Sequence, residues 1–180
     1  MKVVLDACVL YPTVLREILI GAARAGLFTP LWSDRILEEW ARASVKLGPG
    51  AETIARGEIA VLRAGFPKAS VAPHEGLAAR LWLPDPADIH VLAAAIAGHA
   101  DLIVTFNAAD FPRHVLAEEG VRREDPDSFL LDLWRTDPGA VAGAVAAVQA
   151  EAERLSGEPQ PLRALLKRAK LPRLGKVLAG

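Results

Sequence analysis

The sequence of 180 residues has a single cysteine, no long apolar run and no excess of either charge. One cysteine, Cys8, excludes an internal disulfide and a four-cysteine zinc site, and it fits a reducing cytosol. No apolar run reaches the ~18 residues that a membrane-spanning helix needs, because charged residues interrupt every candidate. Twenty-one basic residues balance 22 acidic ones, so the net charge of −1 gives no overall positive field that would attract nucleic acid. These absences exclude a disulfide-stabilised secreted protein and a helical membrane protein.

What the sequence does contain is the composition of an ordinary globular protein. Hydrophobic residues make up 52% and charged residues 24%, which argues against a disordered chain. At roughly 150 residues per domain, the length predicts one domain with a short appendage. The opening residues 1–6 place a carboxylate where a signal peptide would be apolar, so we expect no export and a cytoplasmic location.

Short apolar runs alternate with helical patterns over the first two thirds of the chain. The runs Val3-Val4-Leu5 and Leu102-Ile103-Val104-Thr105 are typical of buried parallel strands. We expect strands at residues 3–5, 27–31, 69–71 and 102–105, and helices at residues 12–25, 33–47, 51–64 and 85–98. This alternation predicts an α/β fold with a central, mostly parallel sheet.

The last third of the chain shows helical patterns only. From Pro126 onward, helices are expected at residues 129–134, 140–155 and 162–169. We therefore predict a first domain at residues 1–125 and a helical extension at residues 126–180. The extension is partly basic, because residues 154–176 hold seven basic residues and one acid, Glu158. This charge is interpreted either as a solvated helical tail or as a contact surface for nucleic acid or an acidic partner.

Several acidic and amide side chains fall where a parallel sheet binds ligands. Asp6 follows the first strand directly, and Asn107 and Asp110 lie in the loop after the second strong strand signal. Asp85 and Asp88 begin the helix that leads into this second strand, so its N-terminus opens on the same edge of the sheet. Crowded carboxylates repel one another unless a divalent cation neutralises them, and Mg²⁺ and Mn²⁺ prefer oxygen ligands. The pattern therefore predicts a Mg²⁺ or Mn²⁺ site at this edge.

The helix after Ser33 offers two glutamates, and helical geometry distinguishes them. At ~100° per residue, Glu38 lies opposite the apolar arc and pairs with Arg42 four residues later. Glu39 lies at the boundary of the arc, from which a side chain can reach the rim of the core. Glu39 is therefore the better candidate ligand, although an ordinary surface position explains it equally well.

The other candidate residues also have structural interpretations. Asp85 precedes a proline and is a good helix N-cap, and Asp88 three residues later completes an acidic capping pattern. Asp110 and Asn107 can simply stabilise a turn or cap a loop. Asp6 has the weakest structural explanation, because an acid directly after an apolar strand has no obvious local partner.

Four segments, taken in order, match the pattern of a known family. The segments are Val3-Val4-Leu5-Asp6, Ser33-Asp34-Arg35-Ile36-Leu37-Glu38-Glu39-Trp40, Leu83-Pro84-Asp85-Pro86-Ala87-Asp88, and Leu102-Ile103-Val104-Thr105-Phe106-Asn107 with Asp110-Phe111-Pro112. They resemble the PIN (PilT N-terminal) domain family of metal-dependent ribonucleases, which includes the VapC-type toxins of bacterial toxin–antitoxin pairs. The resemblance implies a three-layer α/β/α fold with a central sheet of four or five strands. The residues after about Pro126 resemble a helical extension found in part of the family.

The resemblance also implies a function and assigns residues to it. It implies hydrolysis of RNA phosphodiester bonds with Mg²⁺ or Mn²⁺ held by Asp6, Glu39 and Asp88. The auxiliary residues that it implies are Asp85, Thr105, Asn107 and Asp110. Two arginines, Arg35 and Arg113, are candidates for holding the RNA phosphates. A cognate antitoxin protein and a homodimer are the further partners that the resemblance implies. The lack of a long apolar run predicts no membrane association.

Two residues depart from the family pattern. Asn107 stands where the family often has an aspartate, so this position can orient water or a ligand oxygen but adds no charge. Cys8 stands where the family often has a small polar residue, and we expect it to be a small, buried apolar side chain.

Two other classes of function compete with the metal-dependent nuclease. In the first, the acids only cap helices, and the chain is a non-catalytic binding module that acts through its helical tail and a protein or RNA partner. In the second, Asp6 is the nucleophile of a phosphotransferase. That mechanism usually has a second aspartate two residues later, where this chain has Cys8, so it ranks last.

Overall fold

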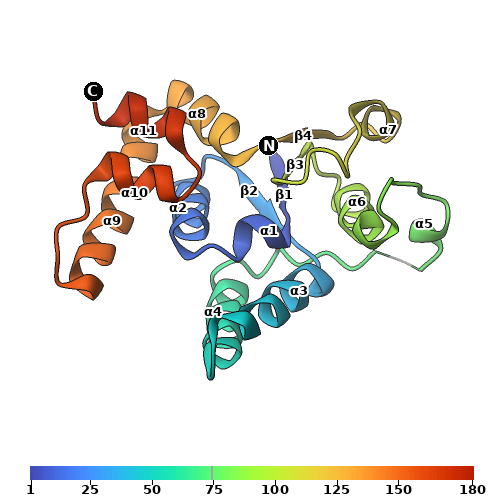
Figure 1. The fold of residues 1–180 in the computed structure, drawn as a ribbon. Helices are drawn as coiled ribbons and strands as arrows, with labels where there is room; N and C mark the ends of the chain where they lie inside the picture. The colour runs from blue at the N-terminus through green and yellow to red at the C-terminus, as the bar shows by residue number, and fades with distance from the viewer. Residues whose placement is uncertain (74) are drawn as a thin grey trace. The chain divides into compact units, whose positions relative to one another are not determined.

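The chain divides by its internal contacts into two units (Figure 1). The computed structural model describes residues 1–73 and 75–180. The first unit comprises Met1–Tyr11 and Thr29–Glu124, and the second comprises Pro12–Phe28 and Asp125–Gly180. Residues 12–28 thus group with the C-terminal helices. The predicted domains at residues 1–125 and 126–180 stay a prediction.

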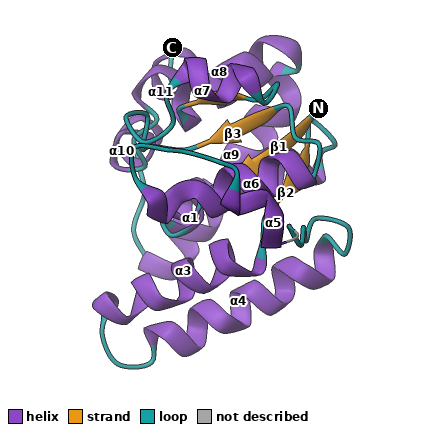
Figure 2. Cartoon of the chain, turned by 90° about the vertical axis from the view of Figure 1, so that its right-hand side faces the viewer, coloured by secondary structure: helices purple, strands orange, loops and turns teal. Residues whose placement is uncertain are grey.

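The first unit is built on a parallel sheet of four short strands, drawn in orange in Figure 2. The strands are β1 (Lys2–Leu5), β2 (Thr29–Leu31), β3 (Leu102–Val104) and β4 (Arg122–Glu124). Their order is β2-β1-β3-β4, and Val4 lies opposite both Leu31 and Ile103. The side chains of β1 after Lys2 are fully buried, as expected of a central parallel strand. The predicted α/β class and mostly parallel sheet are confirmed.

The edges of the sheet differ from the prediction. The strand expected at residues 69–71 is wrong, because Ser70 forms only an isolated bridge with Trp32. The edge strand β4 was not predicted, because Arg122, Arg123 and Glu124 lack the apolar side chains that mark a strand in sequence. The opposite edge strand, β2, has Pro30 at its centre.

The helices of the first unit include two long ones that lie side by side, α3 and α4 (Figures 1 and 2). Helix α3 (Asp34–Ser44) begins at the predicted cap, because the Ser33 hydroxyl accepts the Ile36 N–H at 3.2 Å. Helix α6 contacts both β1 and β3. The remaining bounds are α1 (Ala7–Leu10), η1 (Val45–Leu47), α4 (Ala51–Gly65), α5 (Glu75–Ala79), η2 (Pro86–Asp88), α6 (Ile89–Ala97) and α7 (Arg113–Glu118).

The second unit contains only helices in its described residues. They are α2 (Thr13–Arg24), α8 (Pro126–Thr136), α9 (Pro138–Ser156), α10 (Leu162–Arg168) and α11 (Pro172–Leu178). Helices α2 and α9 pack together, and Gly21 permits their close approach, since a Cβ atom there would lie 3.0 Å from the Ala144 Cβ. The predicted helical C-terminal region is confirmed, whereas α11 was not predicted.

A buried carboxylate joins two helices of the second unit. Asp127 on α8 is 5% exposed, and its oxygens accept the backbone N–H groups of Arg173 at 2.9 Å and Leu174 at 3.0 Å. These two N–H groups belong to the first turn of α11, where a helix has no internal acceptors for them. Asp127 therefore caps α11 from a distant part of the sequence.

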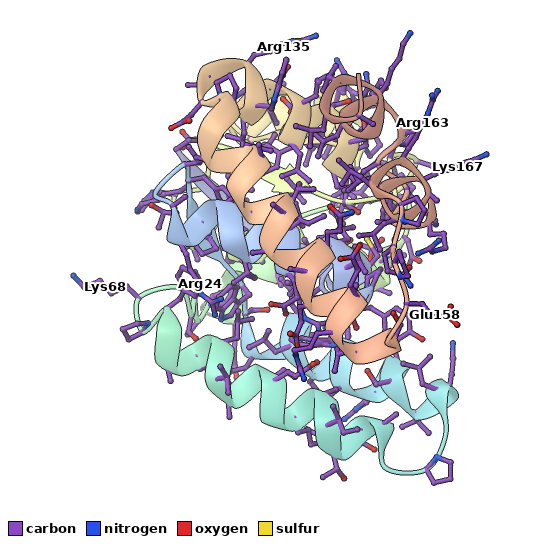
Figure 3. All side chains as sticks on the ribbon, turned by 90° about the vertical axis from the view of Figure 1, so that its left-hand side faces the viewer. Arg24, Lys68, Arg135, Glu158, Arg163 and Lys167 are labelled. Carbon is purple, nitrogen blue, oxygen red and sulfur yellow. The ribbon has the colours of Figure 1, made fainter. Side chains whose placement is uncertain are left out.

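The basic residues of the second unit include side chains that extend into solvent. Figure 3 shows Arg163 and Lys167 extending outward from α10 and Arg135 from α8. All three are exposed. In the described part of the chain, no helix combines the length and the apolar character needed to cross a membrane.

Candidate functional site

Asp6 is held at the junction of the two central strands of the first unit. It directly follows β1, and its backbone N–H donates to the Val104 carbonyl at the end of β3 over 3.2 Å. Its side chain is almost completely buried. The Asp6 Oδ2 atom accepts hydrogen bonds from the Thr105 hydroxyl at 2.7 Å and from the Cys8 thiol at 3.1 Å. Both of these donors reach Oδ2, so Oδ1 is the oxygen that can face an ion.

The two side chains that donate to Asp6 are themselves held by the backbone of the loop after β3. The Asn107 N–H donates to the Thr105 hydroxyl oxygen at 3.0 Å, and the Phe106 N–H donates to the Cys8 sulfur at 3.3 Å. Burial, reinforced by the charge of Asp6, raises the pKa of the Cys8 thiol to about 12, so it remains a protonated donor. Cys8 is thus half-buried with polar contacts, not the small apolar core residue that the sequence suggested.

The two glutamates of α3 occupy the different environments that the sequence analysis distinguished. Glu38 accepts hydrogen bonds from Arg42 at 2.8 Å and from Arg56 at 2.9 Å, and these bonds lower its pKa to about 2. Glu39 is 39% exposed, and its Oε1 lies 3.4 Å from the Arg35 Nε. Burial raises the pKa of Glu39, an effect that Arg35 opposes and Asp6 reinforces. Glu39 therefore lies within the electrostatic influence of Asp6, whereas Glu38 belongs to a surface ion-pair network.

Asp85 and Asp88 begin the same helical segment but have different roles. The Asp85 carboxylate accepts the Ala87 N–H at 2.8 Å and caps η2, as the structural interpretation predicted. The Asp88 carboxylate makes no capping hydrogen bond, so the predicted capping role is wrong for this residue. The pKa of Asp88 is raised from 3.8 to about 6, first by burial and then by the charges of Asp6, Asp110, Asp85 and Glu39, in that order of importance.

Five carboxylates are therefore electrostatically coupled in the first unit, although their oxygens do not converge on a common position. Within residues 1–73 and 75–180, no three His, Cys, Asp or Glu side chains are already placed to hold an ion. The donor set nevertheless fits Mg²⁺ or Mn²⁺, because it consists of hard oxygen ligands and Asp88 is destabilised as an anion. A divalent cation is the ligand that would relieve this repulsion. The assignment of Asp6, Glu39 and Asp88 as metal ligands stays a prediction.

The remaining predicted site residues lie in three different places. Asn107 is exposed in the loop after β3, and its carbonyl accepts the Asp110 N–H at 3.1 Å, which closes a turn. Arg35 donates to the Ala87 carbonyl at 3.3 Å, in addition to its contact with Glu39. Arg113 lines a cavity of about 410 Å³ beside β4, together with Arg122 and Arg123.

One side chain of this region was missed by the sequence analysis. His90 on α6 is 9% exposed, and its Nε2 atom lies 2.8 Å from the Glu39 Oε1. The ring N–H direction is not aligned with that oxygen, so the contact does not meet hydrogen-bond geometry. Burial, with a smaller contribution from the charge of Arg35, lowers the pKa of His90 to about 4. A lone histidine in the apolar segment Ile89–Ala97 gives no sequence signal for such a contact.

The raised pKa of Asp88 predicts how the stability of the metal-free protein depends on pH. A folded-state pKa of about 6 against an ordinary value of 3.8 means that the folded protein binds the proton more tightly. The destabilising contribution of Asp88 is therefore absent well below pH ~4, develops as the pH rises from ~4 to ~6, and is complete above pH ~6. With solvent screening of a half-buried group, we expect Asp88→Asn to stabilise the metal-free protein by about 1 kcal/mol at pH 7.5. This corresponds to an increase in melting temperature of about 2–4 °C in thermal unfolding.

Two comparisons within that experiment test the cause. The stabilisation by Asp88→Asn should be small at pH 4 and disappear by pH ~3, where the wild-type carboxyl is neutral in both states. Added Mn²⁺ should favour the wild type, since only its carboxylate gains from the cation. A stabilisation that is constant from pH 4 to 7.5 would contradict the electrostatic explanation.

Comparison with known families gives a match over much of the chain. A family model described as a PIN domain matches residues 2–109. The matched segment contains Asp6, Glu39 and Asp88, and it ends one residue before Asp110. No curated protein and no solved structure matches the chain.

Proposed function

The chain belongs to the PIN domain family, and on this basis we propose that it is a metal-dependent endoribonuclease that acts as the toxin of a toxin–antitoxin pair. PIN domains are in general nucleases that use divalent metal ions. The observation that carries the proposal is the environment of Asp88. Burial and four other carboxylates, from four separate parts of the sequence, raise its pKa, and a bound cation would counter this effect.

In this proposal, Asp6, Glu39 and Asp88 hold Mg²⁺ or Mn²⁺, with Asp85, Asn107 and Asp110 contributing directly or through water. A bound ion of this kind lowers the pKa of an attacking water and stabilises negative charge on the phosphate. The protein supplies the orientation of the ligands. The Thr105 hydroxyl and the Cys8 thiol bind Asp6 Oδ2, and this leaves Oδ1 for the ion.

An RNA substrate requires positive charge near this acidic group, because carboxylates repel the phosphate backbone. We propose that Arg113, together with Arg122 and Arg123, binds flanking phosphates in the cavity beside β4. Arg35 is the second candidate, since its side chain is 59% exposed and can leave Glu39 for a phosphate once a cation takes its place.

The toxin role adds three finer proposals. A cognate antitoxin protein binds this chain and blocks the acidic group, and the chain forms a homodimer. Both proteins act in the cytoplasm, where the RNA is. These proposals rest on the family resemblance of the sequence, whereas the nuclease activity rests on the family match and on the coupled carboxylates.

The test is a cleavage assay with the purified chain, single-stranded RNA and Mn²⁺, with and without a chelator. We expect cleavage with Mn²⁺ and none with excess chelator, and activity should return when Mn²⁺ is added again. RNA that is bound but not cut under all conditions would favour the non-catalytic binding module. Cleavage that the chelator does not affect would contradict the proposed metal chemistry.

A further inference from the structure

The contact between His90 and Glu39 has an unusual feature. Both ring nitrogens of His90 are inaccessible to solvent, and neither has a hydrogen-bond partner in the described residues. Buried polar atoms in folded proteins are nearly always paired, because an unpaired one loses its bonds to water without compensation. Yet Nε2 lies 2.8 Å from the Glu39 Oε1, a distance at which a hydrogen bond forms if the groups are aligned. The partner of this histidine is therefore already in place.

We propose that His90 is a positioning residue that donates its Nε2 proton to Glu39 Oε1 and thereby directs the other carboxylate oxygen toward the metal ion. The inference rests on the proposed function of Glu39 as a metal ligand. Hydrogen bonds at sites without their ligand are often misaligned and tighten when the ligand binds. Only a rotation of the ring or of the carboxylate is needed here, since the two atoms are already at hydrogen-bond distance.

The position of His90 gives this bond a consequence for the whole ligand set. Glu39 lies on α3, whereas His90 lies on α6, two residues after Asp88. A hydrogen bond between them links α3, which carries the proposed ligand Glu39, to α6, which directly follows the proposed ligand Asp88. Groups that orient ligating carboxylates in this way affect metal affinity although they do not touch the ion.

The burial of His90 distinguishes this role from direct ligation. The Nε2 atom has no solvent-accessible surface, and the Glu39 carboxylate lies beside it, so a hydrated ion has no approach to the nitrogen. Arg35 also contacts Glu39, but it is 59% exposed and its Nε lies 3.4 Å away. An exposed contact of that length is weak, so His90 is the better anchor.

The experiment measures Mn²⁺ binding by the titration of free Mn²⁺ in electron paramagnetic resonance, without RNA or turnover. His90→Leu removes the donor at similar size, and we expect its Kd for Mn²⁺ to increase about 10-fold or more. His90→Gln places an amide N–H where Nε2 stood, and its Kd should remain close to that of the wild type. Arg35→Gln, the matched control on the same carboxylate, should have a smaller effect than His90→Leu.

The outcomes separate this inference from the proposed function. If the wild type binds Mn²⁺ and Glu39→Gln weakens binding, but His90→Leu binds like the wild type, the role of His90 is wrong and the metal site stands. If His90→Gln is as defective as His90→Leu, the donor role is also wrong. A wild type that binds no Mn²⁺ overturns both. Should His90→Leu not fold, pulsed electron paramagnetic resonance of the Mn²⁺-loaded wild type tests the role instead. A nitrogen atom coordinated directly to Mn²⁺ would contradict the positioning role of His90, and coordination by oxygen atoms alone would support it.

Discussion

Asp6→Asn is expected to reduce RNA cleavage by about 10³-fold, because a metal ligand is lost that contributes several kcal/mol to stabilisation of the transition state. The asparagine keeps an oxygen that can accept the Thr105 hydroxyl, and the backbone bond from residue 6 to Val104 is unaffected. The fold should therefore survive. The measurement is the initial rate of cleavage of a labelled RNA at a fixed Mn²⁺ concentration, together with circular dichroism of the variant.

The matched control is Asp34→Asn, which removes a carboxylate that is 84% exposed and pairs with Arg63. This control should cleave RNA at close to the wild-type rate, since a surface ion pair of this kind contributes little. Equal activity in Asp6→Asn and the wild type would show that Asp6 does not hold the catalytic ion. An equal loss of RNA cleavage in both variants would indicate that the rate depends on the overall charge of the protein and not on Asp6 in particular.

Asp127→Ala is expected to destabilise the helices of the second unit by about 3 kcal/mol, since it leaves two backbone N–H groups without their acceptor. Leu174 is fully buried, so water cannot replace the lost bond to its N–H. The cost should lower the melting temperature by about 6–12 °C in a chain of this length. Thermal unfolding gives the overall effect, and hydrogen exchange of Pro172–Leu178 shows whether α11 is the segment that is released.

The control for this change lies on the same helix. Asp132 of α8 is 58% exposed and pairs with Arg135, so Asp132→Ala should change stability by less than about 1 kcal/mol. Asp127→Asn keeps one acceptor oxygen and should fall between the two. A melting temperature and exchange pattern of Asp127→Ala that match the wild type would contradict the capping role.

The parts of the fold that were predicted from sequence are those with a strong local signal. The buried run Val3-Val4-Leu5 specifies a central parallel strand. Ser33 marks the start of α3, because its hydroxyl oxygen accepts a hydrogen bond from the Ile36 N–H in the first turn. Strand β4 has no such signal, since an edge strand of arginine and glutamate is held by non-local contacts, chiefly its pairing with β3. The segment at residues 69–71 forms a single bridge instead of a strand, because the backbone bonds that Ala69 and Val71 form are both to the one residue Trp32.

The candidate site shows the same division between local and non-local information. Helical geometry separated Glu39 from Glu38, and a proline after Asp85 predicted its cap, because both depend on residues close in sequence. The bonds of Thr105 and Cys8 to Asp6, and the approach of His90 to Glu39, depend on which strands and helices become neighbours. No periodicity in the sequence encodes such pairings.

The two edge strands of the sheet affect whether two copies of this chain can associate by strand pairing. Exposed sheet edges tend to recruit further strands and so to promote aggregation. Here β2 carries Pro30, which has no N–H to offer a new strand, and β4 presents Arg122 and Arg123, whose charges repel a second copy of the same edge. Continuous β-sheet between molecules is thereby disfavoured at both edges, so self-association of the first unit is expected to use surfaces other than these edges.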